Sequence, residues 1–156
     1  MTNSKPLLIK LAIAFLIISF IGFLDATYLT VQHYRGLPPE CSIIEGCEEV
    51  VASKYAVMFG VPVALLGGIY YLTIFILSII YLDSKKENII KLAALLTFAG
   101  LIASIWFIYL QLFVIKAICV YCMFSAATSI TLFILGLHIL KLNKNQENVT
   151  IKTNND

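Results

Sequence analysis

Four long apolar stretches constrain this chain more than any other feature of its sequence. They cover residues 7–34, 61–82, 89–114 and 119–140. A helix of about 20 apolar residues crosses the ~30 Å hydrocarbon core of a bilayer, so each stretch is long enough to span a membrane. Only 13% of the residues are charged, against about a quarter in soluble domains. The sequence therefore predicts an all-α integral membrane protein, a bundle of four transmembrane helices.

The polar segments define the rest of the organisation. We expect one membrane domain over residues 1–142 and a disordered, Asn- and Lys-rich tail over 143–156. The first loop is the longest, and its residues 48–55 are predicted to form a short surface helix. The first apolar stretch is longer than the core of a signal peptide and lacks a small-residue cleavage site, so we interpret it as a retained helix.

The basic residues predict the orientation. Four spans place both termini on one side of the membrane. Eight basic residues fall on the side of the termini, and Arg35, Lys54 and Lys116 fall on the other. Because basic residues concentrate in cytoplasmic segments of membrane proteins, we expect both termini to lie in the cytoplasm. The expected location of the protein is the plasma membrane. The long first loop and the start of the fourth span would then be extracytoplasmic. The eight residues are Lys5, Lys10, Lys85, Lys86, Lys91, Lys141, Lys144 and Lys152.

A Cys-x-x-Cys motif, Cys119 and Cys122, lies where the fourth span begins. The N-terminus of a helix carries partial positive charge and unpaired N–H groups, which stabilise a thiolate. A stabilised thiolate attacks disulfides readily and leaves them readily, so the motif predicts thiol–disulfide exchange. Cys122 lies one turn deeper and is the better placed of the two to meet a lipid-soluble electron acceptor.

A second pair, Cys41 and Cys47, lies in the first loop among four glutamates. An extended segment of this length would span ~20 Å, whereas bridged cysteines need Cα atoms within about 7 Å, so the loop must fold back. Gly46 permits such a fold. We interpret the pair as a shuttle: Cys41 takes electrons from an external dithiol, and Cys47 passes them to Cys119.

Other interpretations of the polar residues remain open. The cysteines could form two structural disulfides in a non-catalytic scaffold or transporter subunit. A zinc site is disfavoured, because Cys41-x5-Cys47 is not a usual ligand spacing, and we expect no metal. Asp25 is an ionisable residue within a span, which favours a functional role, but a hydrogen bond to a loop near the outer interface explains it equally well.

The order and spacing of these residues resemble the vitamin K epoxide reductase family. The resemblance covers residues 7–140. Its remaining signature is Val50-x2-Ser53-x-Tyr55-Ala56-x2-Phe59-Gly60-x-Pro62 after the loop cysteines, with Asp25-x2-Tyr28-Leu29-Thr30-x2-His33 in the first span, as in prokaryotic members.

The resemblance implies a four-helix bundle around a quinone pocket. It implies that Cys119 and Cys122 are the active pair, with Cys122 beside the quinone, and that Cys41 and Cys47 are the relay pair. Further roles follow by position. Ser53 matches a loop Ser or Thr near the active cysteines, Phe59 matches an aromatic residue at the rim of the pocket, and Val51 would also contact the quinone.

The chain also departs from the family pattern. Many prokaryotic members continue into a thioredoxin-like domain, whereas here a polar tail follows, so the expected partner is a separate thioredoxin-like thiol oxidase. Vertebrate members carry a Tyr where this chain has Ala126. The expected function is therefore a thiol:quinone oxidoreductase that supports disulfide formation, with ubiquinone, menaquinone or a similar quinone as acceptor. A vitamin K epoxide or quinone reductase is the alternative within the family. DsbB-type oxidases do similar work, but their two cysteine pairs occur in the reverse order.

Overall fold

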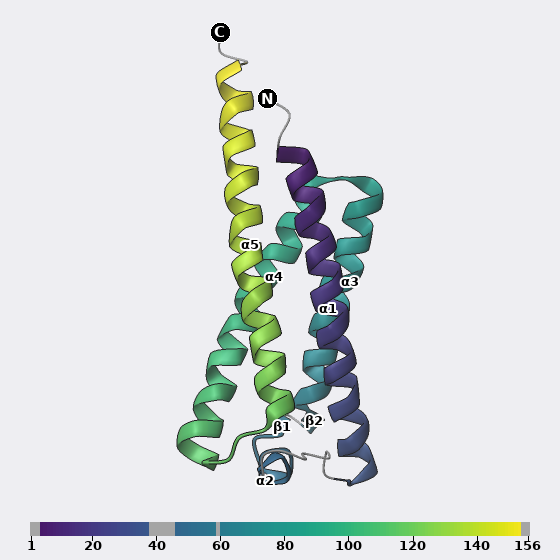
Figure 1. The fold of residues 1–156 in the computed structure, drawn as a ribbon, viewed down its shortest axis with the longest axis vertical. Helices are drawn as coiled ribbons and strands as arrows, with labels where there is room; N and C mark the ends of the chain where they lie inside the picture. The colour runs from purple at the N-terminus through teal and green to yellow at the C-terminus, as the bar shows by residue number, and fades with distance from the viewer. Residues whose placement is uncertain (1–3, 38–45, 59, 154–156) are drawn as a thin grey trace.

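The computed structural model describes residues 4–37, 46–58 and 60–153 of the chain, and the side chains of residues 6–37, 46–58 and 60–144 within them (Figure 1). Cys41 and Phe59 lie outside the described residues. Helices dominate the fold. In chain order the elements are α1 (Ser4–Arg35), α2 (Cys47–Ala52), β1 (Val57–Met58), β2 (Val61–Pro62), α3 (Val63–Ser84), α4 (Glu87–Tyr109), the π-helix η1 (Leu110–Ile115) and α5 (Val120–Thr153).

Four helices within the described residues are long and apolar enough to cross a membrane, which confirms the predicted fold class. They are Pro6–Arg35, Val63–Ser84, Glu87–Ile115 and Val120–Lys144, with mean hydropathies of 2.7, 2.3, 2.1 and 1.9. Their outer faces carry large exposed apolar side chains such as Ile69 and Ile102, which suits contact with lipid chains rather than water.

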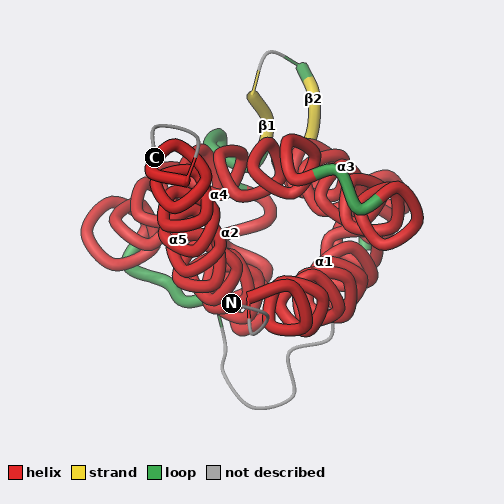
Figure 2. The backbone as a smooth tube through the Cα atoms, turned by 90° about the horizontal axis from the view of Figure 1, so that it is seen from above, coloured by secondary structure: helices red, strands yellow, loops and turns green. Residues whose placement is uncertain are grey.

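The long helices form two closely packed pairs. α1 packs most extensively on α3, and α4 packs on α5, while α3 and α4 touch each other less (Figure 2). Small residues allow the close approaches. A Cβ atom added to Gly22 would lie 2.5 Å from Tyr71 Cε1, and one added to Gly136 would lie 2.8 Å from Thr97 Oγ1. Such small-residue contacts are the usual way in which helices pack inside bilayers.

A buried tyrosine joins the two pairs. Tyr71 on α3 is only 2% exposed, and its hydroxyl donates a hydrogen bond of 2.6 Å to the carbonyl of Ser125 on α5. The same hydroxyl lies 2.8 Å from Thr128 Oγ1. Because this polar group is fully paired inside an apolar bundle, it stabilises a defined register of α5 against α3.

The short elements gather at one end of the bundle. α1 begins and α5 ends at the opposite end, while α2, the β1–β2 hairpin and the first turn of α5 lie together (Figure 1). The hairpin is antiparallel, with Val57 paired with Pro62 and Met58 paired with Val61. The surface helix expected over residues 48–55 corresponds to α2, which is shorter and ends at Ala52.

The C-terminal segment differs from its prediction. Disorder is expected over 143–156, but α5 continues as a helix to Thr153. No Gly or Pro interrupts residues 137–153, and the Lys, Leu, Gln and Glu residues of this segment favour a helix. Asn143 is buried, and its side-chain amide donates to the Ile139 carbonyl at 3.0 Å.

Candidate redox site at the start of α5

The N-terminus of α5 positions the Cys-x-x-Cys pair. Lys116 adopts a left-handed conformation (φ 59°) that ends the preceding π-helix, and α5 begins at Val120. The carbonyl of Cys119 accepts the first helical hydrogen bond, from the Met123 N–H at 3.0 Å. Cys119 therefore occupies the capping position of the helix, and Cys122 is the third helical residue.

A buried glutamine holds Cys119 in place. The Cys119 N–H donates a 2.8 Å hydrogen bond to Gln111 Oε1, and the Gln111 side chain is 2% exposed. Gln111 comes from η1, whose wider turn changes the direction of the side chains that follow α4. Sequence reasoning missed this residue, although a polar side chain inside an apolar stretch is a signal for function.

The capping position also activates the thiol. The hydrogen bond with the Cys122 thiol is the largest influence on Cys119 and lowers its pKa to about 7. The N–H groups of Cys122 and Tyr121 act in the same direction, whereas burial and the negative charge of Asp25 oppose it. Thiolate is the nucleophilic form of cysteine, so Cys119 is reactive near neutral pH.

The loop cysteine that the structure describes packs beside this pair. Cys47 and Cys119 are 1% and 0% exposed and form one apolar cluster with Val50 and Ala117, against which Cys122 packs. Cys119 and Cys122 are free thiols, whereas Cys47 is in a disulfide. Cys41, the other predicted relay residue, lies outside the described residues.

Gly46 fits the loop against the start of α5. Its φ of 150° is rarely adopted by residues with a side chain. A Cβ atom at this position would lie 3.1 Å from the Ile118 carbonyl oxygen and 3.2 Å from the Ile118 nitrogen. The glycine therefore permits close contact between the loop that carries Cys47 and the segment that carries Cys119.

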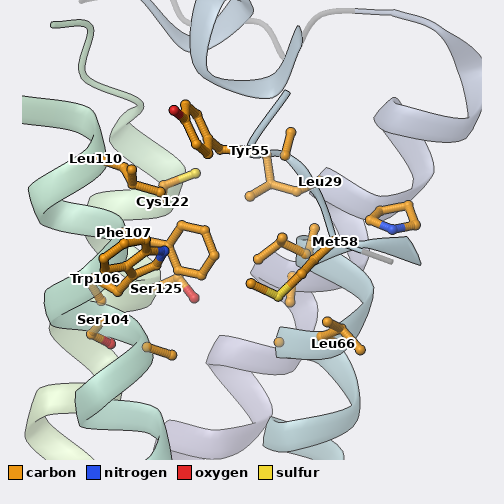
Figure 3. Close-up of a pocket in the computed structure, with 18 of the residues that line it drawn as sticks. Leu29, Tyr55, Met58, Leu66, Ser104, Trp106, Phe107, Leu110, Cys122 and Ser125 are labelled. Atoms are coloured by element: carbon orange, nitrogen blue, oxygen red, sulfur yellow. The ribbon is translucent and has the colours of Figure 1, made fainter. Parts of the chain in front are cut away.

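A large apolar cavity extends from Cys122 into the bundle. Its volume is about 760 Å³, and it is lined by α1, α3, α4 and α5 together with residues around α2 and β1. The Cys122 sulfur points into it, with Trp106 and Phe107 on one side and Leu29 and Met58 on the other (Figure 3). Cavities of this size and character bind apolar small molecules in proteins.

The cavity opens sideways. Three of its lining side chains on α3 and α4 are also exposed on the outer surface: Leu66 (42%), Trp106 (50%) and Ile102 (69%). They lie on α3 and α4, which pack on each other less than α3 packs on α1 or α4 packs on α5. A ligand that enters there would come from the region that the lipid chains occupy.

The other predicted residues differ in how they are placed relative to Cys119 and Cys122. Ser53 and Val51 both line the cavity with Cys122. The Ser53 hydroxyl donates to the Val50 carbonyl at 2.8 Å, so it supports the end of α2. Phe59 lies outside the described residues. Asp25 lies close enough to Cys119 to act on its charge, and its buried Oδ2 has no hydrogen-bond partner among the described residues.

The chain is similar to known proteins over most of its length. A sequence model of the vitamin K epoxide reductase family matches residues 13–137. The chain is 34% identical over 138 residues to the thiol-disulfide oxidoreductase LTO1 of Arabidopsis thaliana, a match that covers 83% of this chain. The match covers 36% of LTO1, so the chain spans about a third of the length of this curated relative.

Proposed function

Because the chain belongs to the vitamin K epoxide reductase family, we propose that it is a membrane thiol:quinone oxidoreductase. It oxidises a separate thioredoxin-like protein outside the cytoplasm and passes the electrons to a membrane quinone. One observation carries this proposal: the two free thiols of one helical turn face different surroundings. Cys119 packs against Cys47, whereas Cys122 opens into the apolar cavity. The similarity to LTO1, which is named as a thiol-disulfide oxidoreductase, supports the same chemistry.

The relay begins in the first loop. A thiolate of the reduced partner attacks the Cys41–Cys47 disulfide at Cys41 and releases Cys47. The partner's second thiol then displaces Cys41, so the partner leaves oxidised and the loop pair is left reduced. This order suits the burial of Cys119, since a side chain with 0% exposure is shielded from a bulky partner while Cys47 lies beside it.

The second exchange joins the two pairs. The Cys47 thiolate attacks Cys119 in the oxidised active pair, which forms a Cys47–Cys119 disulfide and frees Cys122. Cys41 then attacks Cys47, which restores the loop disulfide and leaves Cys119 and Cys122 both reduced. The described structure has this pattern, with Cys119 and Cys122 free and Cys47 in a disulfide.

The cavity fits a quinone head group in size and polarity. A quinone bound there would supply the acceptor for the two electrons and two protons that the active pair gives up when its disulfide forms. Cys122 presents its thiol to the cavity, and Val51, Leu29 and Phe107 line the wall and exclude water. In such a site the protein positions the reacting atoms and controls their surroundings.

We propose that this chemistry lies on the extracytoplasmic side. α1 begins and α5 ends at one end of the bundle, and the cysteines lie at the other (Figure 1). The excess of basic residues near the termini supports a cytoplasmic location for that end. The expected setting is the plasma membrane, where thiols that face outward are in an oxidising compartment.

The test measures the rate of quinone reduction from the change in quinone absorbance. Purified protein in lipid nanodiscs is mixed with a reduced thioredoxin-like protein as the electron donor. Cys122→Ser should reduce turnover to the background rate, because no thiol remains at the cavity. The same variant should leave the loop pair reduced by the donor, because no active-pair disulfide can form to reoxidise it, and mass spectrometry after thiol alkylation measures this. Val120→Ala changes an exposed side chain between the two cysteines and serves as the control. Undiminished turnover in Cys122→Ser would exclude the proposed route.

The same preparation tests the family's other reaction. Ala126 lines the cavity where vertebrate members are expected to carry a tyrosine hydroxyl. We therefore expect no reduction of vitamin K epoxide when a small dithiol is the donor, and chromatographic analysis of the products measures this directly.

A further inference from the structure

Two buried hydroxyl groups in the cavity have no hydrogen-bond partner of acceptable geometry among the described residues. They are the hydroxyls of Tyr70, on α3, and Ser129, on α5. Both side chains line the cavity, and Ser129 is only 4% exposed. The Ser129 hydroxyl is close enough to that of Tyr70 to influence it, but the two form no hydrogen bond of good geometry. A polar group taken out of water without a well-placed partner destabilises the fold, so this pair inside an otherwise apolar wall requires an explanation.

The neighbouring hydroxyls of the cavity are satisfied within the protein. Tyr71 donates to the Ser125 carbonyl at 2.6 Å, and Ser53 donates to the Val50 carbonyl at 2.8 Å. The cavity wall can therefore pair its hydroxyls internally. Tyr70 and Ser129 are the exceptions that the structure identifies.

A glycine on a third helix makes room for both groups. A Cβ atom added to Gly100, on α4, would overlap the Tyr70 hydroxyl oxygen and lie 2.6 Å from Ser129 Oγ. The two oxygens therefore converge on the same small space, although they come from different helices. Three helices thus form a polar cradle, defined here as Tyr70, Gly100 and Ser129.

The cradle lies at a defined depth below the reactive thiol. Ser129 follows Cys122 by seven residues, which places it two helical turns further along α5, or about 10 Å, and on the same face. Side chains of Cys122 and Ser129 both line the cavity. A flat ring that contacts the Cys122 sulfur at one edge can therefore extend its opposite edge toward the cradle.

We propose that Tyr70 and Ser129 donate hydrogen bonds to one carbonyl oxygen of the bound head group, the oxygen remote from Cys122. A carbonyl oxygen has two lone pairs, so it can accept from both hydroxyls at once. This inference rests on the proposed quinone acceptor and specifies its class: a ring with two carbonyl groups opposite each other. Donors fixed in a low-dielectric site also stabilise negative charge that develops on that oxygen as electrons arrive.

The binding test uses the only tryptophan of the chain. Trp106 lines the cavity, so a bound quinone should quench its fluorescence without any turnover. Water-soluble 1,4-naphthoquinone is the probe. Tyr70→Phe and Ser129→Ala should each raise its Kd by about 3- to 10-fold, the effect of one net hydrogen bond, and the double variant should raise the Kd further.

Matched controls remove similar groups elsewhere on α3. Tyr81→Phe and Ser78→Ala each delete a buried hydroxyl that does not line the cavity, so they should leave the Kd unchanged. Infrared difference spectra give a second readout. One carbonyl band of the bound quinone should move to higher frequency in Tyr70→Phe, because a hydrogen bond to it is lost.

The outcomes separate this inference from the proposed function. If the unaltered protein does not bind 1,4-naphthoquinone, the quinone proposal itself fails. If it binds, but the Tyr70 and Ser129 variants bind equally well with unchanged carbonyl bands, the cradle is overturned and the acceptor proposal stands. The wild-type protein should also prefer 1,4-naphthoquinone to 1,2-naphthoquinone, and the double variant should lose that preference.

Discussion

At the residue scale, the capping position accounts for the different environments of the two active thiols. Cys119 ends the irregular segment before α5, where its sulfur is near the N–H groups of the first turn, and Gln111 satisfies its own N–H. Cys122 is one turn further on and lines the cavity. A spacing of three residues thus gives one thiol the polar environment of a helix end and the other an apolar one.

This arrangement predicts the pH dependence of the first thiol. Cys119 has a pKa of about 7, so its thiolate predominates above neutral pH and its thiol below. Replacing Cys122 with Ala removes the main hydrogen-bond donor and should raise this pKa toward the ordinary value for cysteine. Thiolate absorbance near 240 nm, titrated in the protein with its loop disulfide intact, measures the inflection. An inflection that stays near pH 7 in Cys122→Ala would contradict the stated cause.

The sequence was most informative about residues with distinctive chemistry. The Cys-x-x-Cys motif and its place at a helix start were predictable, because cysteine spacing and the end of a polar segment are local signals. Gln111, Tyr70 and Ser129 were not predicted. Their roles depend on partners in other helices or on a π-helical turn, and tyrosine and serine occur at many positions of these spans. Only tertiary packing distinguishes the Tyr70 hydroxyl, which has no hydrogen bond of good geometry within the described part of the chain, from the Tyr71 hydroxyl, which donates to the Ser125 carbonyl.

At the element scale, the contact between the first loop and the start of α5 organises the site. α2 presents Cys47 to the cluster that contains Cys119, and Gly46 sits directly against the Ile118 backbone. The extent of α2 was predictable only in part, since a six-residue helix depends on its contacts more than on its own propensity. The β1–β2 hairpin, with two residues in each strand, was not predicted, for the same reason.

This contact predicts a specific effect of Gly46→Ala. The added methyl group meets backbone atoms that cannot rotate away, so α2 should shift relative to Cys119. Electron transfer from a protein donor to the active pair should slow by about 10- to 100-fold, as expected when reacting atoms are misplaced by about 1 Å. Stopped-flow measurement of active-pair reduction gives the rate.

Gly36→Ala is the matched control for that change. Gly36 also has a positive φ, 64°, but a Cβ atom added there would meet no atom within 4 Å. Its substitution tests backbone strain without crowding the α2 contact. Equal slowing in both variants would assign the effect to strain and not to the position of α2.

At the scale of the whole molecule, the Cys-x-x-Cys pair lies at one end of the bundle, and most of the basic residues lie near the other end. The ends of the four predicted spans lie within four residues of the ends of the apolar helices, because hydropathy over 20 or more positions is a strong signal and the bilayer fixes the required length. A pocket beside Cys122 was expected from the family resemblance, but its full lining was not predicted, since the lining depends on how the helices pack. The helical extension of α5 to Thr153 also lies beyond the reach of hydropathy, because that segment is polar.

The orientation of the bundle gives a prediction for labelling in intact cells. In a cysteine-free background, Tyr34→Cys places a thiol at the cysteine end of the bundle, and Asp83→Cys places one at the end of α3 near the termini; both positions are exposed. A membrane-impermeant maleimide should label the Tyr34 position and leave the Asp83 position unlabelled. Permeabilised cells, in which both should react, are the control. The reverse pattern would place the active thiols in the cytoplasm.

The complete burial of Cys119 beside Cys47 has a consequence for selectivity. A small diffusing thiol such as glutathione that reached an oxidised active pair would reduce it, and the oxidising equivalents would not reach a protein. Because Cys119 has no exposed surface, such a thiol cannot reach its sulfur directly. In the proposed relay, burial therefore reserves the active-pair disulfide for dithiols that react first with the loop pair.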